Sequence, residues 1–153
     1  LFMEGETAGG NVLGLEIVPY GAKIGDGGMT QDDDAETAGT NTVDVNFKNM
    51  ISIYYEGQVD TQIDGSFYRA AISHVTLETD ETVNTGSTYS DESLQGLTLG
   101  FGVKRDSPYH DGFYKIIGEV SHFLGATFDA DNTDNSIELD DFQTAAIRLS
   151  VGF

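Results

Sequence analysis

Apolar and polar residues alternate singly over long stretches of this chain. The alternation is clearest over 43–59, where one parity is mostly large and apolar and the other is polar: Val43, Val45, Phe47, Ile51, Ile53, Tyr55 and Val59 against Asp44, Asn46, Lys48, Ser52, Glu56 and Gln58. Successive side chains of a β-strand point to opposite faces of the sheet. A period of two over this length therefore predicts one long strand.

Strands are predicted in the same way over five further segments: 11–23, 66–79, 94–105, 113–128 and 144–153. Pro19 lacks a backbone N–H and weakens the first of them. The phase of the alternation changes near Ser73, which indicates either a β-bulge or wrongly placed boundaries of the segment. Ile117 and Phe123 fall on the otherwise polar parity of their segment. No helical periodicity is present, so the chain is predicted to be all-β.

The links between these strands alternate in length. The segments 24–42, 80–93 and 129–141 are long, acidic and rich in Gly, Asn or Thr, whereas 60–65 and 106–112 are short turns. In an up-and-down barrel every second connection lies at the same end. Long loops at one end and short turns at the other are typical of an outer-membrane barrel. We therefore predict a single transmembrane β-barrel domain over 1–153.

The number of strands is the open point of this prediction. Six strands are clear, and residues 1–6, followed by the turn-like 7–10, indicate the end of another. Single-chain bacterial barrels have an even number of strands, eight or more. For eight, either an N-terminal hairpin is missing, or a turn is concealed between Val43 and Asp60, or the barrel is built from more than one chain or fragment.

Charge and composition exclude several classes of protein. Twenty-six acidic and seven basic side chains give a net charge of −19, which argues against nucleic acid as a partner. The chain has no cysteine, and therefore no disulfide or thiolate ligand. No apolar run approaches the length of a transmembrane helix. Residues 1–4 have neither the basic nor the apolar region of a signal peptide, so we expect any such peptide to be absent from this chain.

Charged residues within the predicted strands indicate the inside of the barrel. A narrow barrel fills its interior with side chains, and buried charges are tolerated when they are paired. We predict a network of charged side chains in the lumen: Glu16, Lys48, Glu56, Arg69, Lys104, Lys115, Glu119 and Arg148.

The surplus acidic residues are concentrated on the long links. The run Asp32, Asp33 and Asp34 is one example. Loosely bound divalent cations are the only cofactor we expect, with weak binding in a second acidic segment at Asp129, Asp131, Asp134 and Asp140. An EF-hand loop is not expected there, because Asp134 stands where that loop has glycine and Asp140 where it has glutamate.

The histidines are not predicted to take part in catalysis. Ser73 and His74 are sequence neighbours, as are Ser121 and His122, so in strands the members of each pair point to opposite faces. His110 lies in a predicted turn. We expect His122 to be an interfacial residue near the outer rim and no residue to be catalytic.

The final strand resembles the C-terminal signal of bacterial outer-membrane barrels, which ends on an aromatic residue after alternating apolar positions. Those positions are Ile147, Leu149, Val151 and Phe153. The chain as a whole resembles the small barrels of the outer-membrane protein A, protein X and opacity-type class. The resemblance implies a Gram-negative outer membrane, recognition of this strand by the barrel-assembly machinery, and contact with lipopolysaccharide.

The chain departs from that class in lacking tryptophan for the aromatic girdles. We expect phenylalanines and five tyrosines to take that role: Tyr20, Tyr54, Tyr55, Tyr68 and Tyr114. The function expected is structural or surface interaction through acidic extracellular loops, with an unknown partner and without catalysis. Two alternatives remain open, a narrow passive pore and a soluble lipocalin-like carrier of a small apolar ligand, since parity alone does not say which face is inward.

Overall fold

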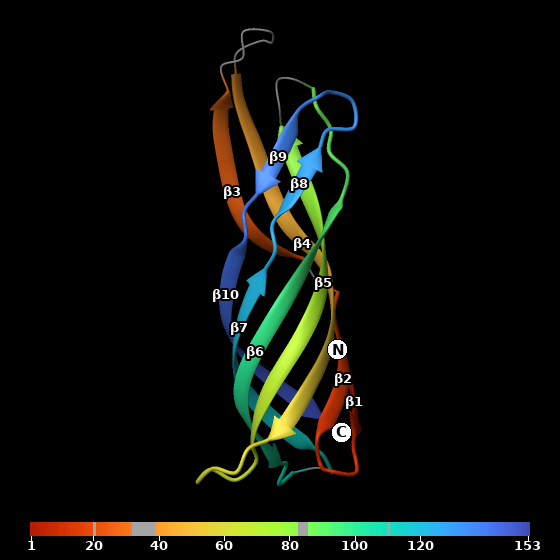
Figure 1. Cartoon of the computed structure of the whole chain (residues 1–153), viewed down its shortest axis with the longest axis vertical. Helices are drawn as coiled ribbons and strands as arrows, with labels where there is room; N and C mark the ends of the chain where they lie inside the picture. The colour runs from red at the N-terminus through yellow and green to blue at the C-terminus, as the bar shows by residue number, and fades with distance from the viewer. Residues whose placement is uncertain (20, 32–38, 83–85, 110) are drawn as a thin grey trace.

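The computed structural model describes residues 1–19, 21–31, 39–82, 86–109 and 111–153, and the described chain is all-β (Figure 1). Its strands are β1 (Phe2–Glu6), β2 (Val12–Val18), β3 (Ala22–Gln31), β4 (Gly39–Gln58), β5 (Ser66–Thr82), β6 (Glu92–Asp106), β7 (Phe113–Phe123), β8 (Ala126–Asp129), β9 (Ser136–Leu139) and β10 (Phe142–Gly152). The prediction of an all-β chain is confirmed.

The main sheet is antiparallel and follows the order of the sequence, β1-β2-β4-β5-β6-β7-β10. β3 continues the line of β2, since both pair with β4, and the interruption falls around Pro19. β8 and β9 form a separate two-stranded ladder, next in sequence to the paired strands β7 and β10. The sheet is thus an up-and-down arrangement of seven strands, rolled about a common long axis (Figure 1).

The connections divide between the two ends of the molecule. The connections after β1, β4 and β6 lie at one end, called here the short-turn end. β3 and β5 end at the opposite, long-loop end, where the connection between β8 and β9 also lies (Figure 1). Most of β3 (Ala22–Gln31) and all of β9 (Ser136–Leu139) nevertheless fall within the predicted links 24–42 and 129–141. β3 is rich in glycine and therefore shows little side-chain periodicity. It forms a strand all the same, because a ladder needs only backbone groups. The run 32–34 lies outside the described residues.

β4 is one uninterrupted strand, so the prediction of a turn concealed between Val43 and Asp60 is wrong. It does contain a register shift between Phe47 and Asn49. Such a bulge moves the residues on one side of it to the opposite face. Val45 and Phe47 consequently pack in the interior, although they share the sequence parity of the outward-facing Ile51.

β5 shows why the alternation changes phase near Ser73. Every second residue from Phe67 to Leu77 is buried, and pairing with both neighbouring strands is regular through Ser73. The prediction of a bulge there is therefore wrong. The phase changes because the polarity of both faces changes along the strand. The inward side chains change from the charged Arg69 to the apolar Val75 and Leu77, and the outward side chains change from apolar to polar.

A small apolar cluster of Val12, Tyr54 and Ala71 lies in the half of the interior that also holds Arg69, and a larger one, called here the apolar core, lies toward the long-loop end. The buried members of the apolar core are Val75, Leu77, Leu94, Phe123 and Phe128. The ring of Phe142 stacks on Phe123, and the ring of Phe47 contacts Phe123 in a tilted arrangement. Phe128 is buried although it shares the sequence parity of the exposed Ile116, because the strand is interrupted between β7 and β8. Phe123 is an exception to the otherwise polar parity of its segment, because this position lies within the apolar core.

Leu77→Ala is expected to lower the free energy of unfolding by about 2–5 kcal/mol, because it leaves a cavity among buried side chains. The matched control is Leu97→Ala, which shortens a half-exposed leucine on β6 and is expected to cost less than half as much. Equilibrium unfolding in urea measures both. Equal losses would contradict the assignment of the two faces.

Candidate functional site

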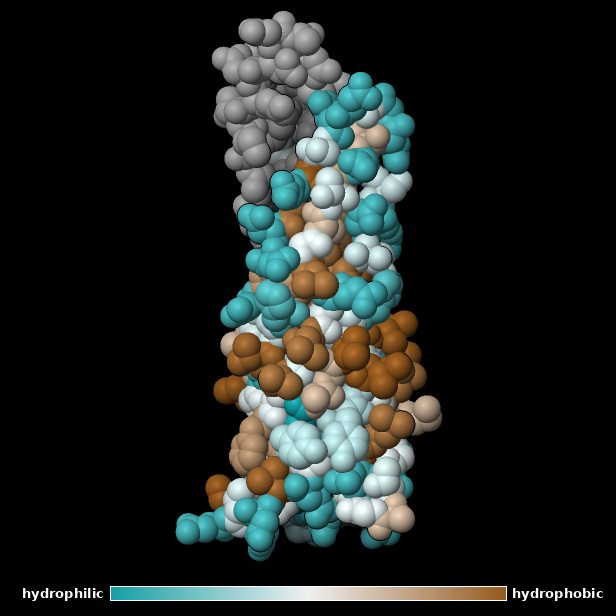
Figure 2. All heavy atoms as spheres, in the orientation of Figure 1, coloured by the Kyte–Doolittle hydropathy of each residue, from teal (hydrophilic) through white to brown (hydrophobic). Residues whose placement is uncertain are grey.

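A belt of exposed apolar side chains surrounds the half of the molecule nearer the short-turn end, as Figure 2 shows for one face. It is built by the outward parity of six strands: Leu13, Ile17, Ile51, Ile53, Tyr55, Tyr68, Ile72, Leu97, Leu99, Phe101, Tyr114, Ile116, Val120, Leu124, Ile147, Leu149 and Val151. On the face drawn in Figure 2, the described surface toward the long-loop end is predominantly polar, and at the short-turn end polar residues are mixed with apolar ones. An exposed apolar surface of this extent marks an interaction site for a protein, a membrane or a ligand.

The tyrosines that were predicted for the aromatic girdles contribute to the belt only in part. Tyr55, Tyr68 and Tyr114 are exposed, and the rings of the first two lie 6.0 Å apart. Tyr54 is almost completely buried in the interior, so its assignment to a girdle is wrong. The fifth, at position 20, lies outside the described residues.

The interior behind the belt is charged, and Arg69 lies at its centre. Its guanidinium pairs with Glu16 at 2.5 Å, with Glu119 at 3.2 Å and with Glu56 at 3.6 Å. The same guanidinium stacks 3.7 Å above the ring of Tyr54. One cation thus holds carboxylates from three strands, β2, β4 and β7.

Lys115 and Arg148 extend this network across the interior. Lys115 pairs with Glu56 and Glu4, and Tyr54 donates a hydrogen bond of 2.8 Å to Glu4. Arg148 pairs with Glu16 and, at 2.9 Å, with Glu119. The resulting charge network consists of Glu4, Glu16, Glu56, Arg69, Lys115, Glu119 and Arg148. It connects six of the seven strands of the sheet, β6 being the exception.

Six of the eight residues predicted for the lumen belong to this network. The prediction for Lys48 is wrong, because the bulge in β4 turns it outward. There it pairs with Glu78 and Asp91, at 3.2 Å each, and these hydrogen bonds raise the pKa of Lys48. Lys104 points inward but lies 4.3 Å from the ring of Phe113 and outside the network.

Glu4 belongs to the network although the sequence did not single it out. The five-residue strand β1 is too short for its own alternation to be decisive. The register of the first hairpin could have identified Glu4 as an inward residue. The turn-like segment 7–10 implies a hairpin, and this hairpin places Glu4 opposite Gly14 and on the same face as Glu16.

A layer of hydroxyl groups separates the charge network from the apolar core. Ser52 and Ser73 share a hydrogen bond of 2.8 Å, and Thr98 and Ser121 share one of 2.7 Å. The interior therefore passes from charged to hydroxyl to apolar groups toward the long-loop end. The hydroxyl pairs satisfy one another, so this layer adds no uncompensated buried polar group.

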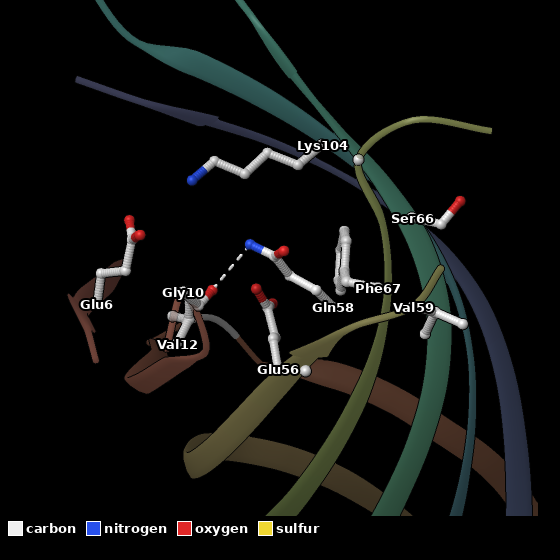
Figure 3. A pocket seen from close by; sticks show the side chains of 11 residues that line it. Glu6, Gly10, Val12, Glu56, Gln58, Val59, Ser66, Phe67 and Lys104 are labelled. Carbon is white, nitrogen blue, oxygen red and sulfur yellow. Dashed lines mark hydrogen bonds between the residues drawn. The ribbon is translucent and has the colours of Figure 1, made fainter. Parts of the chain in front are cut away.

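A cavity of about 370 Å³ lies at the short-turn end of the interior. Glu6, Glu56, Gln58, Phe67 and Lys104 are among its lining residues, and Gln58 donates a hydrogen bond of 3.1 Å to the carbonyl of Gly10 (Figure 3). Both signs of charge face this space. The cavity is therefore polar, unlike the apolar pocket that a carrier of apolar ligands requires.

At the long-loop end two connecting segments are bonded to each other. Ser87 and Thr133 share a hydrogen bond of 2.8 Å, and Asn132 accepts one from the Thr88 amide at 3.0 Å. Ser90 donates to the carboxylate of Asp131. This end is therefore an ordered acidic surface over the described segments 86–91 and 130–135.

The predicted cation-binding residues Asp129, Asp131, Asp134 and Asp140 are exposed on and around the β8–β9 hairpin. Within the described part of the chain, no group of three or more His, Cys, Asp or Glu side chains is placed to hold a metal ion. The structure therefore offers no cage for a cation there.

The serine and histidine pairs are separated as expected. Ser73 is buried while His74 is exposed. Ser121 lies inward in its pair with Thr98, whereas His122 is outside and 3.5 Å from Asp141. The histidine at position 110 lies outside the described residues.

Comparisons with known proteins give no family: no family model matches the chain, and no curated protein and no solved structure is significantly similar to it. In the described residues there is no helix of sufficient length and hydropathy to span a membrane.

Arg69→Met is expected to lower the free energy of unfolding by about 3–5 kcal/mol, because it leaves three buried carboxylates without their shared cation. Lys48→Met is the matched control. It removes an exposed cation with two carboxylate partners and is expected to leave the stability nearly unchanged. Urea unfolding compares the two. A network without structural importance would give equally small losses.

Proposed function

We propose that this chain is an outer-membrane β-barrel protein with a structural or surface-interaction role, and that it carries no catalytic site. One observation carries the proposal: an apolar belt faces outward at the level where the interior is charged. Soluble proteins have the reverse arrangement, with apolar groups inside and charges outside. A charged interior behind an apolar exterior suits a barrel in lipid, where the outward side chains meet hydrocarbon.

The height of the belt supports the membrane assignment. Along β7 and the residue that follows it, the outward apolar side chains run from Tyr114 to Leu124. Roughly ten residue steps at about 3.3 Å correspond to about 33 Å along the strand. With the strand tilt of about 35–45° usual in such barrels, this gives a band of about 25 Å across the membrane, close to that of known outer-membrane barrels.

The direction of insertion follows from the loops. We place the short-turn end at the periplasm and the acidic long-loop end at the cell surface, as in other outer-membrane barrels. Lipopolysaccharide phosphates are then partners through bridging divalent cations, loosely bound by the acidic surface. The terminal strand with Ile147, Leu149, Val151 and Phe153 is the segment offered to the barrel-assembly machinery.

The alternatives are less well supported. A narrow passive pore needs an open lumen, whereas Arg69, Lys115 and Arg148 occupy the interior at the level of the belt. A lipocalin-like carrier needs an apolar cavity, whereas the cavity at the short-turn end is lined by Glu6, Glu56 and Lys104 among others.

The chain is expected to partition into the detergent phase and to migrate differently on gels before and after boiling, because a folded barrel resists detergent denaturation until it is heated. Phase partition followed by unheated and heated electrophoresis measures both properties. A protein that stays in the aqueous phase and shows no shift would exclude the membrane assignment.

Ile53→Arg is expected to weaken folding into lipid vesicles by about 2–4 kcal/mol, because it exposes a cation near the middle of the belt. The matched control is Ile63→Arg, in the β4–β5 turn outside the belt, where the wild-type side chain is similarly exposed. It is expected to fold as the wild type does. The measurement is folding against urea in vesicles, and equal effects would argue against a lipid-facing belt.

A further inference from the structure

We propose that one additional β-strand, contributed by residues ahead of Leu1 in the same polypeptide, lies between β1 and β10 and closes the sheet into a barrel of eight strands. The inference rests on the proposed function, because unpaired backbone groups at a sheet edge have no water to bind in lipid. Its basis is the direction, separation and exposure of the two edges.

The two edges run in the same direction. Each of the seven strands is antiparallel to its neighbour, so the first and the last are parallel to each other. Both run toward the short-turn end (Figure 1). Direct pairing would therefore require a parallel ladder, whereas one strand running toward the long-loop end would pair antiparallel with both edges.

The edges are also too far apart to pair directly. β1 and β10 are fully described, and no Cα atom of one lies within 8 Å of a Cα atom of the other. Paired strands are about 4.7–4.9 Å apart, so a single intervening strand needs about twice that separation. Arg148 of β10 nevertheless pairs with Glu16 of β2, the strand next to β1.

The outward side chains at the edges lack a neighbour on one side. Met3 is 70% exposed and Ile147 is 86% exposed, against 61% for Ile53 and 53% for Leu97 inside the sheet. The added strand would cover these flanks with alternating apolar side chains facing outward.

The topology points to the source of this strand. Every strand in the main sheet lies beside the strand that precedes it along the chain, allowing for the interruptions between β2 and β3 and around β8 and β9. The free side of β1 is thus the place of the segment before Leu1. A second copy in the same membrane orientation fits poorly, since its β1 would again run parallel to β10.

Engineered cysteines test the edges, because the chain has none of its own. A probe strand of alternating leucine and threonine is fused ahead of Leu1 through a flexible Gly/Ser linker. A cysteine in the probe is expected to form a disulfide with Met3→Cys in one variant and with Ile147→Cys in another. A control probe with proline at the threonine positions, which removes ladder donors, is expected to form neither.

Two results without the probe would overturn the inference. A disulfide within the Met3→Cys, Ile147→Cys double variant would show that the edges pair directly. A dimer linked through Ile147→Cys alone would show that a second copy occupies the edge. The mature protein from its source membrane is expected to exceed the mass of these 153 residues by at least a strand and a loop, and an equal mass would exclude the proposed source.

Phase partition of every variant separates the two proposals. Variants that remain in the aqueous phase would contradict the membrane assignment itself. Variants that enter the detergent phase but form neither probe disulfide would contradict only the closing strand.

Discussion

The pairing of Arg69 with three buried carboxylates is the interaction on which the interior depends. Glu16, Glu56 and Glu119 come from three different strands and converge on this guanidinium. Buried charges cost several kcal/mol each in desolvation unless they are paired in good geometry. The network therefore fixes the relative positions of the strands, because a shift of register would turn these side chains toward the opposite face.

The surroundings of the sheet explain why its interior changes along the long axis. Within the belt the outward side chains are apolar, so the interior is free to hold charge, and mutual pairing is the way to satisfy it. Toward the long-loop end the outward side chains are polar and the interior becomes an apolar core around Leu77 and Phe123. Under the proposed function, the change marks the boundary between hydrocarbon and water.

The acidic end gains order from bonds between its connections. Asn132 and Thr133 bond to the segment 86–88, which leaves many of the carboxylates on the outer surface. A surface of this charge repels anionic partners and attracts cations. In the proposed orientation it is the part of the protein that meets the cell exterior.

The sequence by itself determined the class of fold, most of the strands and six members of the charge network, because alternation and charge within strands are local properties. Tertiary structure decided which segments join the sheet through backbone pairing alone, as β3 does, and where a bulge reverses the faces, as at Phe47. It also decided the partners of Arg69. Those outcomes depend on register between distant strands, which no local pattern of side chains encodes.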